Sequence, residues 1–188
     1  VRWSGDLPLN QLNQVLLVTE QGLGDNLQFI RYAIALRDQG VDVSLCSQPK
    51  LYSLIQSSEI DPAPLTIKQA NNLSEGTWLP LLSVPRILEV SQSNPIITEP
   101  YIKSTNELNA KWKVILSENK RPNIGINWRG NRKGAGNHQI RNIHPPAFRQ
   151  ITRAIEGNFL SLQRGAQQIE IDQIKHSNSL NAHEIEVL

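Results

Sequence analysis

The segment between residues 14 and 46 limits the possible folds of this chain more than any other part of the sequence. Residues 14–19 (QVLLVT) form a continuous apolar run of strand length, as expected for a strand covered on both faces. Two glycines follow, apolar residues then recur at helical spacing, and Gly40 stands where a helix would end. Residues 41–46 (VDVSLC) have the pattern of a second strand. This order predicts a right-handed βαβ unit with parallel strands.

The same order of elements returns later in the chain. Residues 48–100 give weaker signals, with a short helix expected in PKLYSLIQSS and a strand leading into a loop in TWLPLLSVP. A helix is predicted at residues 105–118, after which NKRP breaks the pattern and NIGINW begins a new buried strand. A glycine-rich basic loop, a helix from about Pro145 to Glu156 and a strand in NFLSLQRG follow, and we expect Phe148, Ile151 and Ile155 to face inward.

These patterns place the protein in the α/β class. They predict two α/β units and not one continuous sheet. We expect the first domain to span residues 1–118 and the second to span residues 119–188.

Composition excludes several classes of protein. The net charge of +2 is too small to suggest nonspecific nucleic-acid binding through charge. The sequence also lacks aromatic residues interspersed with basic ones and lacks the pattern of a recognition helix. No apolar run approaches the roughly 20 residues that cross a bilayer, and the first residues lack a signal-peptide core, so we expect a cytoplasmic protein without a transmembrane segment. Cys46 has no second cysteine to pair with and is expected to be a buried apolar residue. Trp78, Trp112 and Trp128 are expected in packing.

The turn in TEQGLGDNLQF resembles a dinucleotide-binding loop but lacks two of its parts. A dinucleotide fingerprint requires a third glycine, where this chain has Leu27, and an acid after the second strand, where VSLCSQ has none. The sequence therefore argues against a nicotinamide or flavin cofactor. An oxidoreductase remains only a third reading.

Asp25 has two interpretations. It stands three residues before Gln28, the spacing of an N-cap and N3 residue that satisfy the first amides of a helix. It also follows a predicted strand, and ligands of open α/β sheets bind at the carboxyl ends of strands. The two roles are compatible, so the sequence leaves both open.

The loop between Arg129 and Arg141 contains Arg132, Lys133 and His138 and no acid. A helix begins directly after it, so cations and free helix amides are expected to meet around a phosphate or diphosphate. The alternative is a solvated basic loop made flexible by its glycines. The loop lacks the Gly-Lys-Ser/Thr of a Walker motif, and His138 and His144 lack metal-ligand spacing, so no metal site is expected.

A set of motifs in order resembles one enzyme family. LLVTEQGLGDNLQFIRYAIALRDQG, LPLLSVP, PYIK, IGINWRGN, IRNIHPPAFRQI and FLSLQRG resemble bacterial glycosyltransferases related to the family-9 heptosyltransferases, which often follow tetratricopeptide repeats. The WSGDLPL opening is similar to the junction after such repeats. The resemblance covers nearly the whole chain. It implies the GT-B architecture, with a Rossmann-like acceptor domain followed here by a partial second Rossmann-like domain for a nucleotide-sugar donor.

The resemblance also implies roles for individual residues in an inverting, metal-independent sugar transfer without a cofactor. Asp25 matches the proposed base for the acceptor hydroxyl, and Arg141 matches a basic residue against the donor diphosphate. The remaining implied substrate-binding residues flank these positions: Gly22, Gly24 and Gln28 at the turn, Asn127, Arg129 and Asn131 after the first donor-domain strand, and Gln163 and Arg164 after the second.

The chain departs from the family because residues 123–188 represent only part of a donor domain. We therefore expect a missing C-terminal half and an incomplete enzyme. The expected partners are a nucleotide-sugar donor and a glycan, lipid or protein acceptor. The alternative is a non-catalytic remnant that binds a sugar, an anion or a protein.

Overall fold

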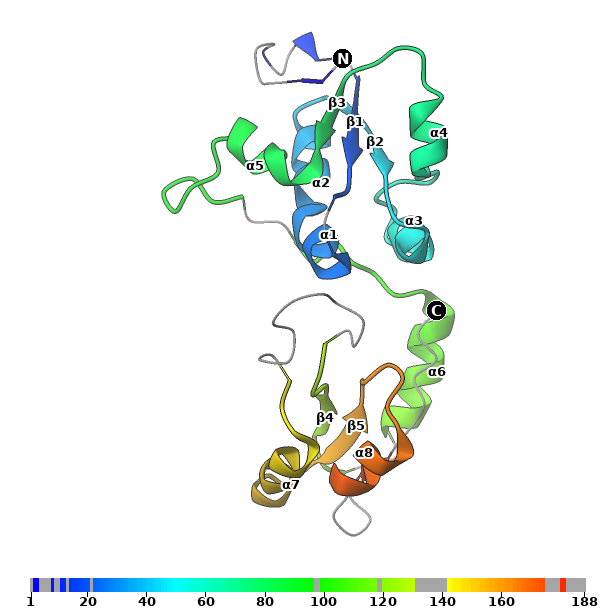
Figure 1. Ribbon diagram of the computed structural model, residues 1–188, viewed down its shortest axis with the longest axis vertical. Coiled ribbons are helices and arrows are strands. Elements are labelled where there is room, and N and C mark those ends of the chain that lie inside the picture. The colour runs from blue at the N-terminus through cyan, green and yellow to red at the C-terminus, as the bar shows by residue number, and fades with distance from the viewer. Residues whose placement is uncertain are drawn as a thin grey trace. The chain divides into compact units, whose positions relative to one another are not determined.

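The protein consists of two compact units, Val1–Asn106 and Glu107–Leu188, seen in a computed structural model (Figure 1). The structure describes residues 2–3, 8, 11–12, 14–20, 22–96, 99–117, 120–130, 142–174 and 180–181. Each unit contains its own parallel sheet, which confirms the prediction of an α/β chain with two units. The compact units divide at the start of helix α6 (Asn106–Ser117), whereas the predicted boundary follows this helix.

The first unit contains a parallel sheet with the order β2-β1-β3. Its strands are β1 (Gln14–Val18), β2 (Asp42–Cys46) and β3 (Trp78–Pro80). Isolated parallel bridges extend it at both edges, from Cys46 to Leu65 and from Trp78 to Arg2. The predicted strand, helix and parallel strand at residues 14–46 are confirmed.

Short helices connect these strands. They are α1 (Leu23–Phe29), α2 (Arg31–Asp38), η2 (Pro49–Leu51), α3 (Tyr52–Ser57), α4 (Ile67–Asn71), η3 (Leu81–Ser83) and α5 (Val84–Ile87). The sequence predicts one helix after the glycine turn, but the structure divides it at Ile30. Gly40 follows with a positive φ of 86°, which glycine adopts without a steric cost. The predicted loop after β3 is instead helical.

The two faces of the first sheet differ in burial. Val15, Leu17, Val43, Leu45 and Leu79 alternate onto one face, are at most 3% exposed and join the core that contains Ile30, Ala33 and Leu36 of the α1–α2 pair. Cys46 is also buried, as predicted, and its burial raises the pKa of the thiol. Leu16 and Val18 point to the opposite face and are only half-buried. That face carries the pocket described below.

The chain leaves the first unit through a segment that is fixed to helices. The Tyr101 hydroxyl donates to the Leu27 carbonyl oxygen at 2.7 Å and accepts from Arg31 Nη2 at 3.2 Å. The Lys103 amide donates to Ser58 Oγ at 2.9 Å, and its Nζ pairs with Glu59 at 2.7 Å. This segment therefore holds the α1–α2 junction and the end of α3.

The second unit has a parallel sheet with the order β4-β5-β6. After α6 its elements are β4 (Asn123–Ile126), α7 (Pro145–Ala154), β5 (Asn158–Ser161), α8 (Gln168–Ile174) and β6 (Leu180–Asn181). Its core contains Trp128, Phe148 and Phe159 with three isoleucines, Ile126, Ile171 and Ile174. None of the helices in the described parts of the two units is long and apolar enough to cross a membrane.

Helix α7 corrects one prediction. Phe148 faces the core as expected, but Ile151 is 42% exposed and Ile155 is 48% exposed. Thr152, four residues after Phe148, is buried in their place, because residues four apart lie on the same side of a helix. Ile155 lies beyond the last helical residue, so helical spacing does not apply to it.

Candidate functional site

The glycine turn after β1 begins helix α1 earlier than the sequence predicts. Gly22 is the N-cap residue, with extended backbone angles, and its carbonyl oxygen accepts from the Asn26 amide at 3.1 Å. Asp25 therefore lies in the first turn of the helix, and the prediction that it is the N-cap is wrong. Gln28, predicted as its N3 partner, is an exposed residue of the last turn.

Asp25 is exposed and follows the carboxyl end of β1. This edge of a parallel sheet is where α/β proteins bind ligands. The carboxylate lies close to Gly22, since a Cβ atom added there would be 3.4 Å from Asp25 Oδ2. A Cβ atom on Gly24 would meet no heavy atom within 4 Å, so packing does not require glycine at that position. Asp25 is thus accessible and does not act as the N-cap of the helix.

The same edge carries buried polar groups that sequence reasoning missed. Asn26 is fully buried, and neither its Nδ2 nor its Oδ1 has a hydrogen-bond partner among the described residues. Ser47 and Tyr52, which follow β2, also bury side-chain oxygens that have no partner in the described part of the chain. Each unmet group costs about 1–3 kcal/mol unless water or a ligand satisfies it. The only sequence signal for these residues is their position just after a strand.

Gln163 organises the loop that follows β4 in the second unit. Its Oε1 accepts from the amides of Trp128 at 3.2 Å and Arg129 at 2.9 Å. The Arg129 amide also lies 3.4 Å from Asn127 Oδ1. The structure thus brings together Asn127, Arg129 and Gln163, three of the residues predicted to bind substrate. Arg164 follows, with an exposed side chain.

The Arg129 side chain is engaged within the protein. Its Nε and Nη2 donate to the two carboxylate oxygens of Glu170 at 3.0 and 3.2 Å, and Nη2 also donates to the Gly165 carbonyl oxygen. The Arg129 side chain is 10% exposed and that of Glu170 is 13% exposed. The Arg129 guanidinium is therefore occupied by contacts within the second unit. Glu170 gave no signal in the sequence, because it lies far from the loop along the chain.

Two hydrogen bonds join the ends of the basic loop. The Gly130 amide donates to Asn142 Oδ1 at 3.1 Å, and the Ile143 amide donates to the Trp128 carbonyl oxygen at 2.8 Å. Helix α7 begins shortly after, with two prolines in its first turn as predicted. Asn131 and Arg141 lie outside the described residues, as do Arg132, Lys133 and His138.

Within the described ranges, no group of three His, Cys, Asp or Glu side chains is placed to hold a metal ion. Comparison of the chain with protein-family models, curated proteins and solved structures finds no match.

Proposed function

We propose that this chain is part of a GT-B glycosyltransferase that moves a sugar from a nucleotide-sugar donor to an acceptor hydroxyl. The observation that carries the proposal is the exposed Asp25 carboxylate after β1, at the carboxyl edge of a parallel sheet. An ordered set of motifs resembling family-9 glycosyltransferases supports it.

In the proposed reaction, Asp25 accepts the proton of the acceptor hydroxyl as its oxygen attacks the sugar. The bond from the sugar to the diphosphate breaks, and the configuration at the sugar inverts. General-base catalysis of this kind contributes about 100- to 10,000-fold to rate. The leaving diphosphate is stabilised by Arg141 and the start of α7, with no metal required. Asn131 belongs to the same proposed donor site.

The second unit limits which groups serve the donor. The amides of Trp128 and Arg129 are already bound by Gln163, and the Arg129 guanidinium is bound by Glu170. The two amides and the guanidinium therefore fix the shape of the loop, through their contacts with Gln163 and Glu170. In this proposal, Asn131, Arg141 and Arg164 contact the donor directly.

The test measures nucleotide-sugar binding by calorimetry and donor hydrolysis by release of nucleoside diphosphate. In the complete enzyme of which this chain is proposed to be part, we expect nucleotide-sugar binding, and Asp25→Asn should lower turnover at least about 100-fold with donor affinity nearly unchanged. Asp38→Asn, an exposed acid at the end of α2, is the matched control and should retain wild-type turnover. An active Asp25→Asn variant would limit Asp25 to a local role in the helix.

A second candidate is a protein that binds without catalysis. It is favoured by the Arg129–Glu170 pair, because neutralising this arginine removes a cation from the proposed donor side. This candidate predicts saturable sugar or anion binding with no product release. Asp25→Asn would then leave every measured quantity unchanged.

A further inference from the structure

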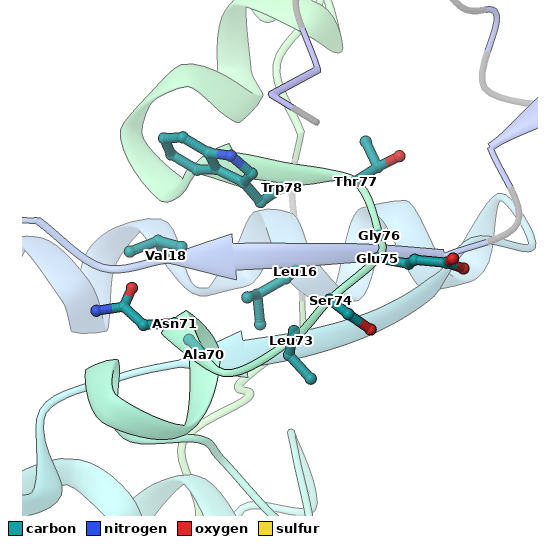
Figure 2. A pocket seen from close by; sticks show the side chains of 10 residues that line it. All are labelled: Leu16, Val18, Ala70, Asn71, Leu73, Ser74, Glu75, Gly76, Thr77 and Trp78. Atoms are coloured by element: carbon teal, nitrogen blue, oxygen red, sulfur yellow. The ribbon is translucent and has the colours of Figure 1, made fainter.

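A pocket of about 420 Å³ opens on the half-buried face of the first sheet (Figure 2). Leu16 and Val18 of β1, two residues of α4, the loop at residues 73–77 and Trp78 of β3 line it. Helices α1 and α2 lie behind the sheet in this view, so the pocket is on the opposite face. Its volume falls within the range of about 300–1,000 Å³ typical of small-molecule sites.

The pocket is separate from the Asp25 turn. The loop at residues 73–77 precedes β3 and therefore lies at the amino edge of the parallel sheet, whereas Asp25 follows the carboxyl end of β1. The Leu16 amide donates to the Thr77 carbonyl oxygen at 2.8 Å, which fixes this loop against the middle of the sheet. The pocket accordingly does not depend on the function proposed for Asp25.

The middle and one wall of the pocket are apolar. Leu16 and Leu73 lie in the middle, and the Trp78 ring lies across β1 from them, on the side of Val18 (Figure 2). Leu73 is 53% exposed and Trp78 is 37% exposed, so a ligand would remove further apolar surface from water. The Arg2 guanidinium lies 5.6 Å from the centroid of the Trp78 ring, close enough for a cation-π contact that holds the ring.

The polar groups of the pocket lie around this apolar surface. Asn71 and Glu75 occupy opposite ends, and Ser74 and Thr77 lie along the loop (Figure 2). None of these four side chains makes a hydrogen bond within the described part of the chain. They offer amide, carboxylate and hydroxyl groups, and the lining contains no basic side chain. The exposed Glu75 carboxylate opposes the binding of an anion.

We propose that this pocket binds a neutral sugar. A pyranose ring presents C–H groups that fit the negative face of an aromatic ring, and its hydroxyls donate to and accept from amides, carboxylates and hydroxyls. A fatty acyl chain would make no use of the polar side chains around the apolar surface, and a phosphate would face the exposed Glu75 carboxylate, while the nearby Arg2 guanidinium is engaged with the Trp78 ring. A neutral sugar satisfies both the apolar and the polar parts of the pocket.

The experiment titrates the full chain with glucose, galactose, mannose, N-acetylglucosamine and their disaccharides, and follows the indole N–H signals by NMR. We expect saturable shifts of the Trp78 signal with a dissociation constant of about 1 mM for the best sugar. Trp78→Ala should raise the dissociation constant for the sugar, measured by calorimetry, roughly tenfold or more. Ala70→Leu places a larger side chain in the pocket from α4 and should have a similar effect. Leucine is a good helix former, so the helix itself should be retained.

Trp112→Ala is the matched control. Trp112 belongs to α6 of the second unit and also has a nearby cation, with Lys111 Nζ 6.0 Å from its ring centroid, so its loss should leave sugar affinity unchanged. The proposal is overturned if no sugar shifts Trp78, or if Trp112→Ala weakens binding as much as Trp78→Ala. Tighter binding of inorganic phosphate or octanoate at Trp78 would also overturn it. So would self-association that Trp78→Ala abolishes, because the face would then be an interface between copies.

Because the readout is binding alone, an inactive Asp25→Asn variant that still binds sugar separates this proposal from the function proposed for the turn.

Discussion

The two units hold the loop after their first strand in different ways. In the first unit the chain passes from β1 through Gly22 directly into α1, and the α1–α2 pair is fixed by a large apolar core. In the second unit the loop after β4 is held by Gln163, by the Arg129–Glu170 pair and by Asn142. The described core of this unit is much smaller. Apolar packing thus orders the first loop, and polar contacts order the second.

The largest expected effect tests the apolar packing of the first unit. Leu17→Ala removes a fully buried side chain from β1 and should lower the free energy of unfolding by about 4 kcal/mol. Leu16→Ala, its neighbour on the half-buried pocket face, should cost clearly less. Chemical denaturation followed by circular dichroism measures both. Equal losses would contradict the difference between the two faces.

The next effect tests the polar support of the second unit. Glu170→Gln leaves the nearly buried Arg129 without its charged partner and should destabilise the second unit by about 2–3 kcal/mol. Glu59→Gln breaks the exposed pair with Lys103 in the first unit and should have a much smaller effect. Denaturation at low and high salt compares the two. A salt-sensitive loss for Glu170→Gln would contradict its burial.

The Glu59–Lys103 pair also predicts the direction in which stability changes with pH. The hydrogen bond from Lys103, followed by its charge, lowers the pKa of Glu59 below its ordinary value. A lowered pKa in the folded state gives stability that is present at neutral pH and is lost as the pH falls through that pKa. Wild type should therefore lose its small advantage over Glu59→Gln on acidification. A constant difference down to acidic pH would contradict this assignment.

A smaller effect concerns the loop after β4. Gln163→Ala removes the acceptor shared by the Trp128 and Arg129 amides and should cost about 1 kcal/mol. Hydrogen exchange should show faster exchange at these two amides than in wild type. Arg164→Ala, at the adjacent exposed position, should leave their exchange unchanged. Unchanged protection in Gln163→Ala would mean that the ion pair alone orders the loop.

The smallest effect is the response of Cys46 to alkaline pH. Burial raises the pKa of this thiol, so the unfolded chain releases its proton at a lower pH than the folded chain. Stability from this group is complete below about pH 8.5 and decreases as the pH rises above it. Cys46→Ser should remove most of this alkaline slope, as measured by denaturation at several pH values. Rapid labelling of the native thiol by a maleimide would contradict its burial.

Much of the fold was predictable because it depends on patterns local in sequence. The apolar run at residues 14–19, the helix spacing after it and the position of Gly40 correctly predict β1, the helical segment and β2. The break at Ile30 was not predictable, because both sides of it have good helical spacing. The prediction for Ile151 was wrong because hydrophobicity alone does not identify the buried side of a short helix, and the prediction for Ile155 was wrong because the helix ends before it.

The candidate sites were predictable only in part. The sequence placed Asp25 and Gln163 after the carboxyl ends of strands, and in the structure Asp25 lies in the first turn of the helix after β1 and Gln163 lies just after β5. It did not predict that Asp25 lies past the cap, since Gly22 and Asp25 are both common N-cap residues. It also missed the contact between Arg129 and Glu170 and the pocket beside Trp78, because each joins segments that are distant along the chain.

The segment around Tyr101 and Lys103, through which the chain leaves the first unit, is mechanically coupled to two helices of that unit. The chain that continues into α6 is attached to the Leu27 carbonyl of α1 and to Ser58 after α3, and these helices follow the two strands whose ends form the candidate edge. Tension on the chain at residue 106 therefore reaches the end of α3 through Lys103 before it reaches α1, the helix that carries Asp25, through Tyr101. Tyr101 thus tethers the exiting chain to the helix that carries Asp25.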